Sequence, residues 1–242
     1  MEAAIIIQDL YKSFGSNHVL KGFNLELKRG ENLAVLGKSG SGKSVLIKCI
    51  IGLMQQDEGE IIVLGQSIRS LNQDELDHLR VKIGFLFQSN ALYDSMTVRE
   101  NLEFPLRRHW MEISNKETGD LVMESLENVG LAHTVDLMPA ELSGGMRKRI
   151  ALARTLILKP QIILYDEPTT GLDPITSKEI SELMNELQKK YNTSSITISH
   201  DMNCIQRTAD RVILLVDGIA YADGEFDQLK ASTDPVILPY FE

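Results

Sequence analysis

Apolar and polar residues follow different patterns in three parts of the chain. In the first part, short apolar runs are separated by Gly, Asn and Asp, which predicts strands with turns between them. These predicted strands cover residues 5–10, 23–27, 32–36 and 60–64. Residues 44–54 show the 3.6-residue period of a helix, directly after a strand and a glycine-rich loop. That order of strand, loop and helix is typical of a phosphate-binding unit.

The middle and the end of the chain differ from this β-rich start. In the middle, helical periodicity predicts helices over residues 98–104, 115–129 and 143–158. In the last part, a strand, an amphipathic helix and another strand alternate as in a parallel α/β sheet. They cover residues 161–165, 176–191 and 195–199. Two apolar runs around Asp217-Gly218 then predict a closing β-hairpin.

Composition narrows the class of protein. The 242 residues are 43% hydrophobic and 24% charged, which fits one globular domain with a subdomain. The formal net charge of −9 argues against general nucleic-acid binding, because backbone phosphates require clustered Lys and Arg. We expect no membrane-spanning segment, since no apolar run approaches roughly 20 residues. We also expect no secretory signal, since the N-terminus lacks a basic segment followed by a long apolar one. Cys49 and Cys204 lack metal-ligand spacing, so we expect reduced, structural cysteines.

A glycine-rich segment fits the pattern G-x-x-x-x-G-K-[ST]. In such a loop, successive backbone N–H groups wrap a phosphate chain, and the following helix N-terminus faces it. Lys43 is then the cation for the β and γ phosphates, and the Ser44 hydroxyl is a ligand for Mg²⁺. The candidate ATP-binding residues of this loop are Gly37, Lys38, Ser39, Gly40, Ser41, Gly42, Lys43 and Ser44.

Two adjacent acids end the predicted strand at residues 161–165. Asp166 and Glu167 would therefore stand at the carboxyl end of the strand, beside the phosphate loop. Asp166 suits Mg²⁺, and Glu167 suits a general base on an attacking water. A solvated turn is the alternative interpretation of such a pair. The phosphate loop upstream favours the functional one.

Ser143, Gly144 and Gly145 precede a basic and apolar helix. Ser143 is the predicted N-cap of this helix, and an N-terminus with two glycines is also suited to bind an anion. A second phosphate-binding device far from the first is puzzling within one site. It becomes understandable if it covers ATP held by a partner subunit.

Together these residues resemble the ATP-binding subunits of ABC transporters, over essentially the whole chain. Residues 142–146 resemble the signature motif of that family, with Met146 where many members have Gln. The phosphate loop and residues 162–167 match the Walker A and B motifs, although Tyr165 replaces the commoner Leu. The resemblance assigns further site residues by position: Tyr11 for adenine stacking, Gln88 in the Q-loop, Asp173 in the D-loop and His200 as the switch histidine.

This resemblance implies a fold, a mechanism and partners. The implied fold is α/β, a P-loop NTPase with an N-terminal antiparallel β subdomain and an inserted helical subdomain. Residues 1–88 and 161–242 would form the catalytic core, and residues 89–160 the helical subdomain. Lys43, Gln88, Glu167 and His200 would act in catalysis, with Ser44, Gln88 and Asp166 on Mg²⁺. Two copies would pair head to tail around two ATP, beneath membrane permeases, on the cytoplasmic face of the membrane.

The subfamily is indicated by longer stretches. Residues 87–106, 146–149 and 166–175 resemble the ATPases of Mce/Mla-type lipid transporters. This implies phospholipid cargo, and as further partners a lipid-binding Mce-type protein and a small STAS-domain regulator. Amino-acid and methionine importers share parts of the same stretches, so such an importer stays the alternative.

Other classes of ATPase fit the chain less well. ABC ATPases that act on ribosomes usually carry two nucleotide units in one chain, and repair ATPases separate the Walker motifs by a long coiled coil. This sequence has one nucleotide unit and no such coiled coil. A non-catalytic nucleotide-binding module is disfavoured because Glu167 and His200 are both present.

Overall fold

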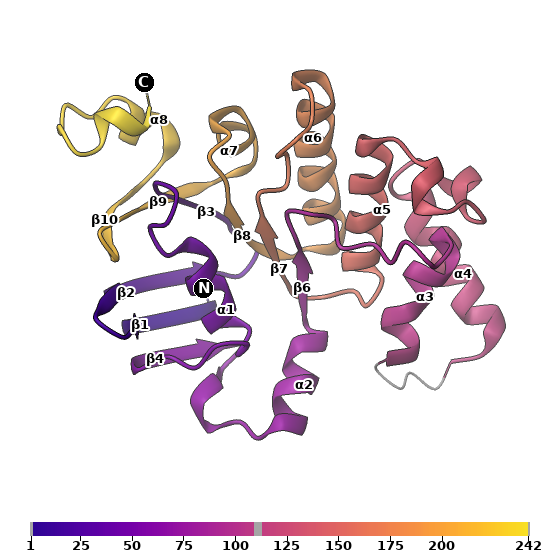
Figure 1. Ribbon diagram of the computed structural model, residues 1–242, viewed down its shortest axis with the longest axis horizontal. Coiled ribbons are helices and arrows are strands. Elements are labelled where there is room, and N and C mark those ends of the chain that lie inside the picture. The colour runs from indigo at the N-terminus through magenta and orange to yellow at the C-terminus, as the bar shows by residue number, and fades with distance from the viewer. Residues whose placement is uncertain (1, 109–112, 242) are drawn as a thin grey trace.

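Two sheets organise the molecule. The computed structural model describes residues 2–108 and 113–241. A four-stranded antiparallel sheet has the order β2-β1-β4-β5, and a six-stranded sheet has the order β10-β9-β3-β8-β7-β6 (Figure 1). The strands are β1 (Ala3–Phe14), β2 (Asn17–Lys28), β3 (Asn32–Leu36), β4 (Glu58–Val63), β5 (Gln66–Ser67), β6 (Ile83–Leu86), β7 (Ile162–Asp166), β8 (Ser194–Ile198), β9 (Arg211–Val216) and β10 (Ile219–Gly224).

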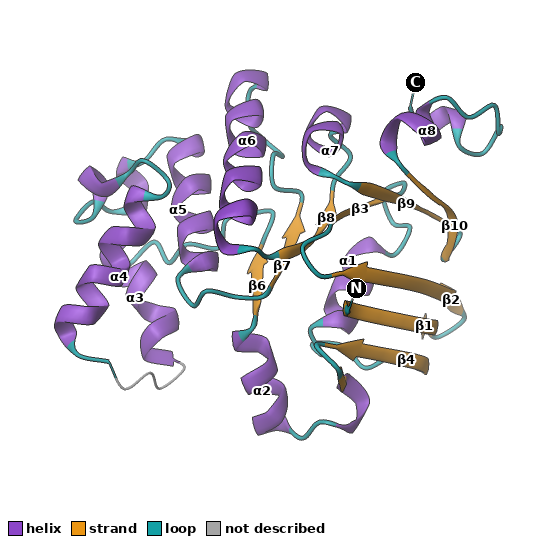
Figure 2. Cartoon of the chain, turned by 180° about the vertical axis from the view of Figure 1, so that it is seen from behind, coloured by secondary structure: helices purple, strands orange, loops and turns teal. Residues whose placement is uncertain are grey.

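Helices cover both faces of the six-stranded sheet. α5, α6 and α7 lie on one face, while α1 and the antiparallel sheet lie on the other (Figures 1 and 2). The helices are α1 (Lys43–Ile50), α2 (Gln73–Val81), α3 (Val98–Arg108), α4 (Asn115–Glu127), α5 (Gly144–Leu156), α6 (Pro174–Tyr191), α7 (Met202–Thr208) and α8 (Phe226–Lys230). Short 3₁₀ turns lie at Ile68–Ser70, Ala132–Thr134, Pro139–Glu141 and Leu238–Tyr240.

The alternation of side chains along β7 joins two hydrophobic cores. Ile162 and Leu164 point into the core that includes α1 and the antiparallel sheet. Ile163 and Tyr165 point to the opposite face, into the core shared with α3, α4, α5 and α6. A strand buried on both faces reads as a continuous apolar run, which is the pattern of residues 162–165. The α/β P-loop fold expected from the sequence is confirmed.

The helices α3, α4 and α5 gather at the end of the molecule far from α8 (Figure 2). Val98 and Leu102 of α3, Leu126 of α4 and Ile150 of α5 are all fully buried between them. These helices share their core with α6 and β7, so no separate core marks a boundary. The division at residues 89 and 160 stays a prediction.

The sequence analysis missed several of the described elements and misplaced several helix ends. It did not include β5, α2, β6, α7 or α8, and it ended the helix at residues 98–104 before Pro105. Pro105 lies inside α3, which continues to Arg108. The first helix is shorter than the predicted residues 44–54, because α1 ends at Ile50.

Parallel pairing brings four loops to one edge of the six-stranded sheet. β3 pairs in parallel with β8, β8 with β7, and β7 with β6. Their carboxyl ends therefore meet at the same edge. The phosphate loop follows β3, and the loops after β6, β7 and β8 hold Gln88, Glu167 and His200. The fold thus collects candidate residues that lie far apart in the sequence.

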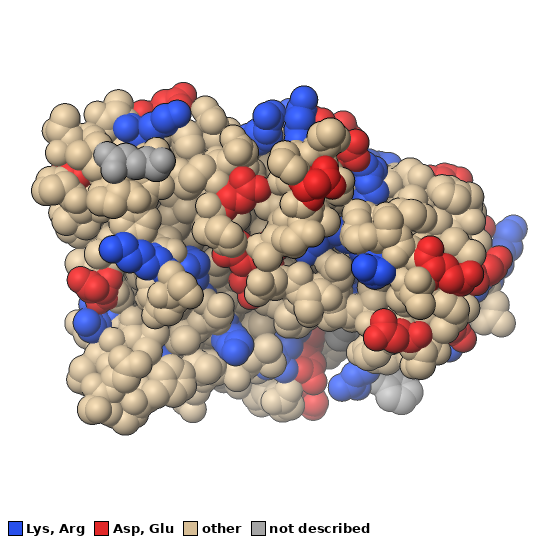
Figure 3. Space-filling view, turned by 45° about the horizontal axis from the view of Figure 1, so that its top comes forward, with Lys and Arg blue, Asp and Glu red and all other residues tan. Residues whose placement is uncertain are grey.

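Surface and burial agree with the composition. On the face shown in Figure 3, the Lys and Arg side chains are interspersed with those of Asp and Glu. Within residues 2–108 and 113–241, none of the helices combines the length and apolar character needed to cross a bilayer.

Cys49 and Cys204 are both free and buried, as expected. Burial raises the pKa of the Cys49 thiol to about 11.

Candidate active site

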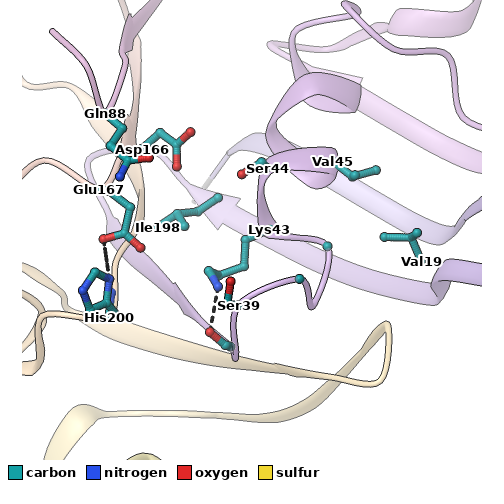
Figure 4. Close-up of a pocket in the computed structure, with 13 residues that line it drawn as sticks. Val19, Ser39, Lys43, Ser44, Val45, Gln88, Asp166, Glu167, Ile198 and His200 are labelled. Atoms are coloured by element: carbon teal, nitrogen blue, oxygen red, sulfur yellow. Dashed lines mark hydrogen bonds and ion pairs between the residues drawn. The ribbon is translucent and has the colours of Figure 1, made fainter. Parts of the chain in front are cut away.

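A cavity of about 570 Å³ opens at this edge of the sheet. The phosphate loop forms one wall, and the ends of β6, β7 and β8 form the other (Figure 4). The lining residues are Val19, Gly37, Ser39, Gly40, Gly42, Lys43, Ser44, Val45, Gln88, Asp166, Glu167, Ile198 and His200. The cavity therefore unites most of the candidate residues of the phosphate loop with the two acids, Gln88 and His200.

The phosphate loop depends on glycine where it meets β2. Gly42 has a φ of 107°, and a Cβ at this position would lie 2.8 Å from Val19 Cγ1. A side chain would therefore both strain the backbone and strike the neighbouring strand. α1 begins at the next residue, so its unpaired N–H groups face the loop. This arrangement suits an anion, and the role of the individual loop residues stays a prediction.

Lys43 is the cation of the cavity wall. Its Nζ donates hydrogen bonds to the carbonyl oxygens of Gly37 (2.7 Å) and Lys38 (3.0 Å). Burial lowers the pKa of Lys43, while the charges of Glu167 and Asp166 raise it. The ammonium is thus folded over the loop, where a phosphate chain would offer it anionic partners in place of two carbonyl groups.

Asp166 stands in an environment that disfavours its charged form. Burial is the main cause that raises the pKa of its carboxyl group, and the neighbouring Glu167 raises it further. The charges of Lys43, Lys48 and Lys148 act in the opposite direction. A cation close to Asp166 would relieve both unfavourable contributions.

Both the main chain and the side chain of Glu167 make contacts that fix its position. The residue adopts a left-handed φ of 51°, and its N–H donates to the Ile198 carbonyl oxygen of β8 at 2.8 Å. Glu167 Oε2 lies 2.9 Å from His200 Nδ1 and accepts a hydrogen bond from Thr170 Oγ1 at 3.2 Å (Figure 4). A strained backbone at a cavity wall is a common feature of functional residues. The carboxylate is placed to accept a proton from a water in the cavity.

Gln88 approaches Asp166 and Glu167 from the loop after β6 (Figure 4). Lys148 of α5 contacts the main chain of Gln88, because its Nζ donates a hydrogen bond to the Gln88 carbonyl oxygen at 3.2 Å. Lys148 is only 1% exposed. Burial lowers its pKa to about 8, and the charge of Asp166 partly offsets that shift. The sequence analysis did not single out Lys148, because a Lys between two Arg suggests an exposed face.

Ser143, Gly144 and Gly145 do not line this cavity. Ser143 caps α5, as expected, and its Oγ accepts from the Met146 N–H at 3.2 Å. Ser143 and Gly144 are exposed, while a Cβ on Gly145 would lie 2.8 Å from Thr176 Cγ2 of α6. The N-terminus of α5 is therefore accessible, and it forms no part of the cavity wall.

Asp173 also lies outside the cavity and has a structural contact of its own. Its carboxylate caps α6 by accepting from the N–H groups of Ile175 (3.0 Å) and Thr176 (3.1 Å). The Thr176 hydroxyl and these N–H groups hold the pKa of Asp173 below its usual value. Its predicted role at a subunit interface stays a prediction.

The sequence matches a known family in the same region. A family profile described as "ABC transporter" matches residues 20–170, which include the phosphate loop, Asp166 and Glu167. The chain belongs to the ABC transporter family, as an ATP-binding subunit. It therefore binds and hydrolyses ATP, and cassettes of this family pair into dimers and work with membrane permeases.

Relatives of this ABC subunit span more than one transport system. It is 37% identical to "Intermembrane phospholipid transport system ATP-binding protein MlaF" of Haemophilus influenzae, over 98% of this chain and 90% of that protein. It is equally identical to the chloroplast protein TRIGALACTOSYLDIACYLGLYCEROL 3 of Arabidopsis thaliana, over 98% and 72%. "Methionine import ATP-binding protein MetN" of Campylobacter jejuni is 38% identical, over 93% and 71%.

A solved structure shows how such a cassette assembles. The ATP-binding cassette MJ0796, in a dimeric post-hydrolysis state bound to ADP and Pi, superposes with a TM-score of 0.82. It is 33% identical, and the match covers 92% of this chain and 98% of MJ0796.

The aromatic residue assigned to adenine does not line the cavity. Tyr11 lies against β2, where a Cβ on Gly22 would be 2.9 Å from its hydroxyl. Phe14 is 48% exposed at the end of β1, with Lys12 Nζ 5.5 Å from its ring centroid. Lys12 and Tyr11 are neighbours in a strand, so their side chains point to opposite faces. Phe14 shares the face of Lys12 and, like Tyr11, does not line the cavity. Its exposed ring is a second candidate to stack on adenine, which the sequence analysis did not consider.

Proposed function

We propose that two copies of this chain close head to tail around ATP. Each ATP would lie between the phosphate loop of one copy and the N-terminus of α5 in the other. Support comes from the exposed Ser143, which caps α5, and the exposed Gly144, which begins it; neither lines the cavity of its own chain. A helix N-terminus favours the anionic γ-phosphate, so ATP would join the two surfaces and hydrolysis would release them.

The residues around the cavity fit hydrolysis with Mg²⁺. Ser44, Gln88 and Asp166 offer a hydroxyl, an amide oxygen and a carboxylate, the hard oxygen donors that Mg²⁺ takes. When bound, Mg²⁺ would neutralise charge on the β and γ phosphates. Glu167 would remove a proton from the attacking water, and His200 would hold the Glu167 carboxylate through its 2.9 Å contact. Lys43 would bind the phosphates from the loop.

We further propose that a permease segment docks in a groove beside Gln88. This second cavity, of about 270 Å³, lies between the β6 loop, α3 and α5. Phe85 and Phe87 pack edge to face with centroids 4.1 Å apart, and Tyr93 packs on Phe104 at 4.8 Å. Three Arg side chains accompany these rings: Arg80, Arg108 and Arg154. An aromatic floor with cations suits a short helix that carries apolar and acidic side chains.

The groove can be tested by a matched pair of exposed positions. Phe87→Glu places a charge on the groove floor, where Phe87 is 43% exposed. Leu53→Glu places the same charge at a residue that is 60% exposed and lines neither cavity. In affinity purification from membranes, Phe87→Glu should lose the co-purifying permease and Leu53→Glu should keep it. Retention of the permease by both variants would contradict docking at this groove.

For the cargo, we propose phospholipid moved between membranes. The support is the resemblance of residues 87–106 and 146–149 to the Mce/Mla group, together with the name of the relative MlaF, which is described as part of an intermembrane phospholipid transport system. The complex would sit peripherally on the cytoplasmic face, with an Mce-type lipid-binding protein and a STAS-domain regulator as further partners. Import of an amino acid is the second candidate, because the methionine-import relative is just as similar.

The experiment is extraction of the native complex. It would be purified through a tag on this subunit, analysed for phospholipid and small solutes, and assayed for ATPase activity with vesicles. The proposal expects bound phospholipid and stimulation by lipid. A bound amino acid, or stimulation only by a soluble binding protein, would overturn the lipid cargo and leave the family assignment unchanged.

A further inference from the structure

The loop that carries Gln88 is held by two cations of α5. Lys148 Nζ donates to the Gln88 carbonyl oxygen at 3.2 Å. Arg154 donates to the carbonyl oxygens of Asn90 at 3.0 Å and Ala91 at 2.8 Å. Three carbonyl groups of one four-residue segment therefore depend on side chains of a single helix.

The segment needs this support because its backbone is strained. Asn90 and Ala91 have φ angles of 64° and 52°, and neither is glycine. Such conformations persist only where the surroundings impose them. Arg154 holds this strained pair beside the groove, whereas Lys148 holds the end of the segment that reaches the active-site cavity.

Lys148 is an unusual choice for such a buried position. Its side chain is 1% exposed, and the carboxylate whose charge acts on it is Asp166. An apolar side chain of similar length would fill the space without the cost of burying an ammonium group. A role in fold stability alone therefore does not account for the charge. The contact with Gln88 and the proximity to Asp166 suggest a role in the active site.

We propose that Lys148 is a positioning residue for ATP hydrolysis. It fixes the main chain at Gln88 from inside the protein, and so sets where the Gln88 side chain stands relative to Asp166. The inference rests on the proposed function, in which these two residues face Mg²⁺. Helix α5 begins within the signature motif, so this contact also connects the buried face of that helix directly to the active site of its own subunit.

The test uses Lys148→Met in the full-length chain, with Arg149→Met as the matched control. Arg149 is a cation of the same helix, but it donates to Val129 and Glu179 instead of the Gln88 loop. Lys148→Met should lower kcat roughly 10- to 100-fold, the size of a misplaced catalytic group, with KM for ATP nearly unchanged. Lys148→Gln, which keeps an N–H donor, should recover part of the rate.

Two further measurements separate positioning from a structural role. Amide hydrogen exchange of residues 88–92, without nucleotide, should be faster in Lys148→Met and unchanged in Arg149→Met. The thermal midpoint of Lys148→Met should stay level or rise. Wild-type kcat and exchange in Lys148→Met would overturn the inference, and so would a kcat loss that only follows a fall in the thermal midpoint. In parallel, Glu167→Gln tests the proposed function itself. Full ATPase activity of this variant would contradict the proposed active site, whatever the result for Lys148→Met.

Discussion

The phosphate loop and the N-terminus of α5 are both built to bind anions, yet only one of them has a complete site around it. The loop, which carries Lys43, stands in a cavity with Gln88, two acids and His200 from three further strand ends. The α5 N-terminus is capped by Ser143 and faces solvent, apart from the contact of Gly145 with α6. The first region is surrounded by candidate residues of its own chain, whereas in the proposed head-to-tail pair the second acts on the ATP of the other chain.

This difference separates two kinds of mutation. Changes around the cavity should alter the ATP that the same chain holds. Changes at the α5 N-terminus should alter the ATP held by the partner copy. Four experiments follow from this separation, from the largest expected effect to the smallest.

Glu167→Gln should slow hydrolysis by roughly 10²- to 10⁴-fold, the usual contribution of a general base. ATP binding should persist, because the phosphate loop is untouched, and a closed dimer should accumulate. Steady-state ATPase assays and size-exclusion chromatography with ATP and Mg²⁺ measure the two effects. A monomer under all ATP conditions would contradict the closed pair, and a wild-type rate would remove Glu167 from its role.

Ser143→Arg should lower hydrolysis at the opposite site by roughly 10²- to 10³-fold, as when a preorganised donor to a reacting group is lost. The added Arg would also crowd the exposed helix start. Photo-cross-linking of ATP in a heterodimer with one tagged mutant subunit shows which loop still loads nucleotide. If the mutant subunit itself fails to load, then Ser143 acts within its own chain.

Lys43→Ala should weaken ATP binding by roughly 10- to 100-fold, the worth of a charged hydrogen bond to phosphate. The pKa of Lys43 is lowered by burial, but the nearby acids favour the ammonium form. Isothermal titration calorimetry with ATP measures the change. Unchanged affinity would show that the loop does not hold the phosphates.

Phe14→Ala should weaken ATP binding by about tenfold, because an aromatic ring stacked on a base contributes ~1–3 kcal/mol. Tyr11→Ala should have little effect on affinity, since Tyr11 lies on the opposite face of β1 against Gly22. The same titration on both variants decides between the two rings. A larger loss for Tyr11 would restore the assignment made from the sequence.

The phosphate loop and the paired acids could be predicted because their signals are local. A glycine pattern before a helix and two acids after an apolar strand need no distant information. Strand β6 was missed because a four-residue apolar run is ambiguous. Helix α2 is polar along most of its length, although its capping box of Asn72 and Glu75 was a usable signal.

Other features depend on packing between distant segments, which the sequence does not display. Lys148 sits in a basic run, yet it is buried and contacts a loop sixty residues away. Tyr11 and Phe14 are three positions apart, and shifts in strand register at Leu10/Tyr11 and Lys12/Ser13 affect which face each ring takes. The fold class is confirmed, whereas the roles of individual site residues stay predictions for the experiments above.

The two buried cysteines make the chain convenient for spectroscopic labelling. Thiol reagents attack the thiolate, and burial raises the pKa of both Cys49 and Cys204. A single cysteine introduced at an exposed position would therefore be labelled selectively in the otherwise native sequence. Pairs of spin labels at residue 53, which lines neither the groove nor the cavity, would report the separation of two subunits during one ATP cycle. Opening and closing could thus be followed without removing any native residue from the core.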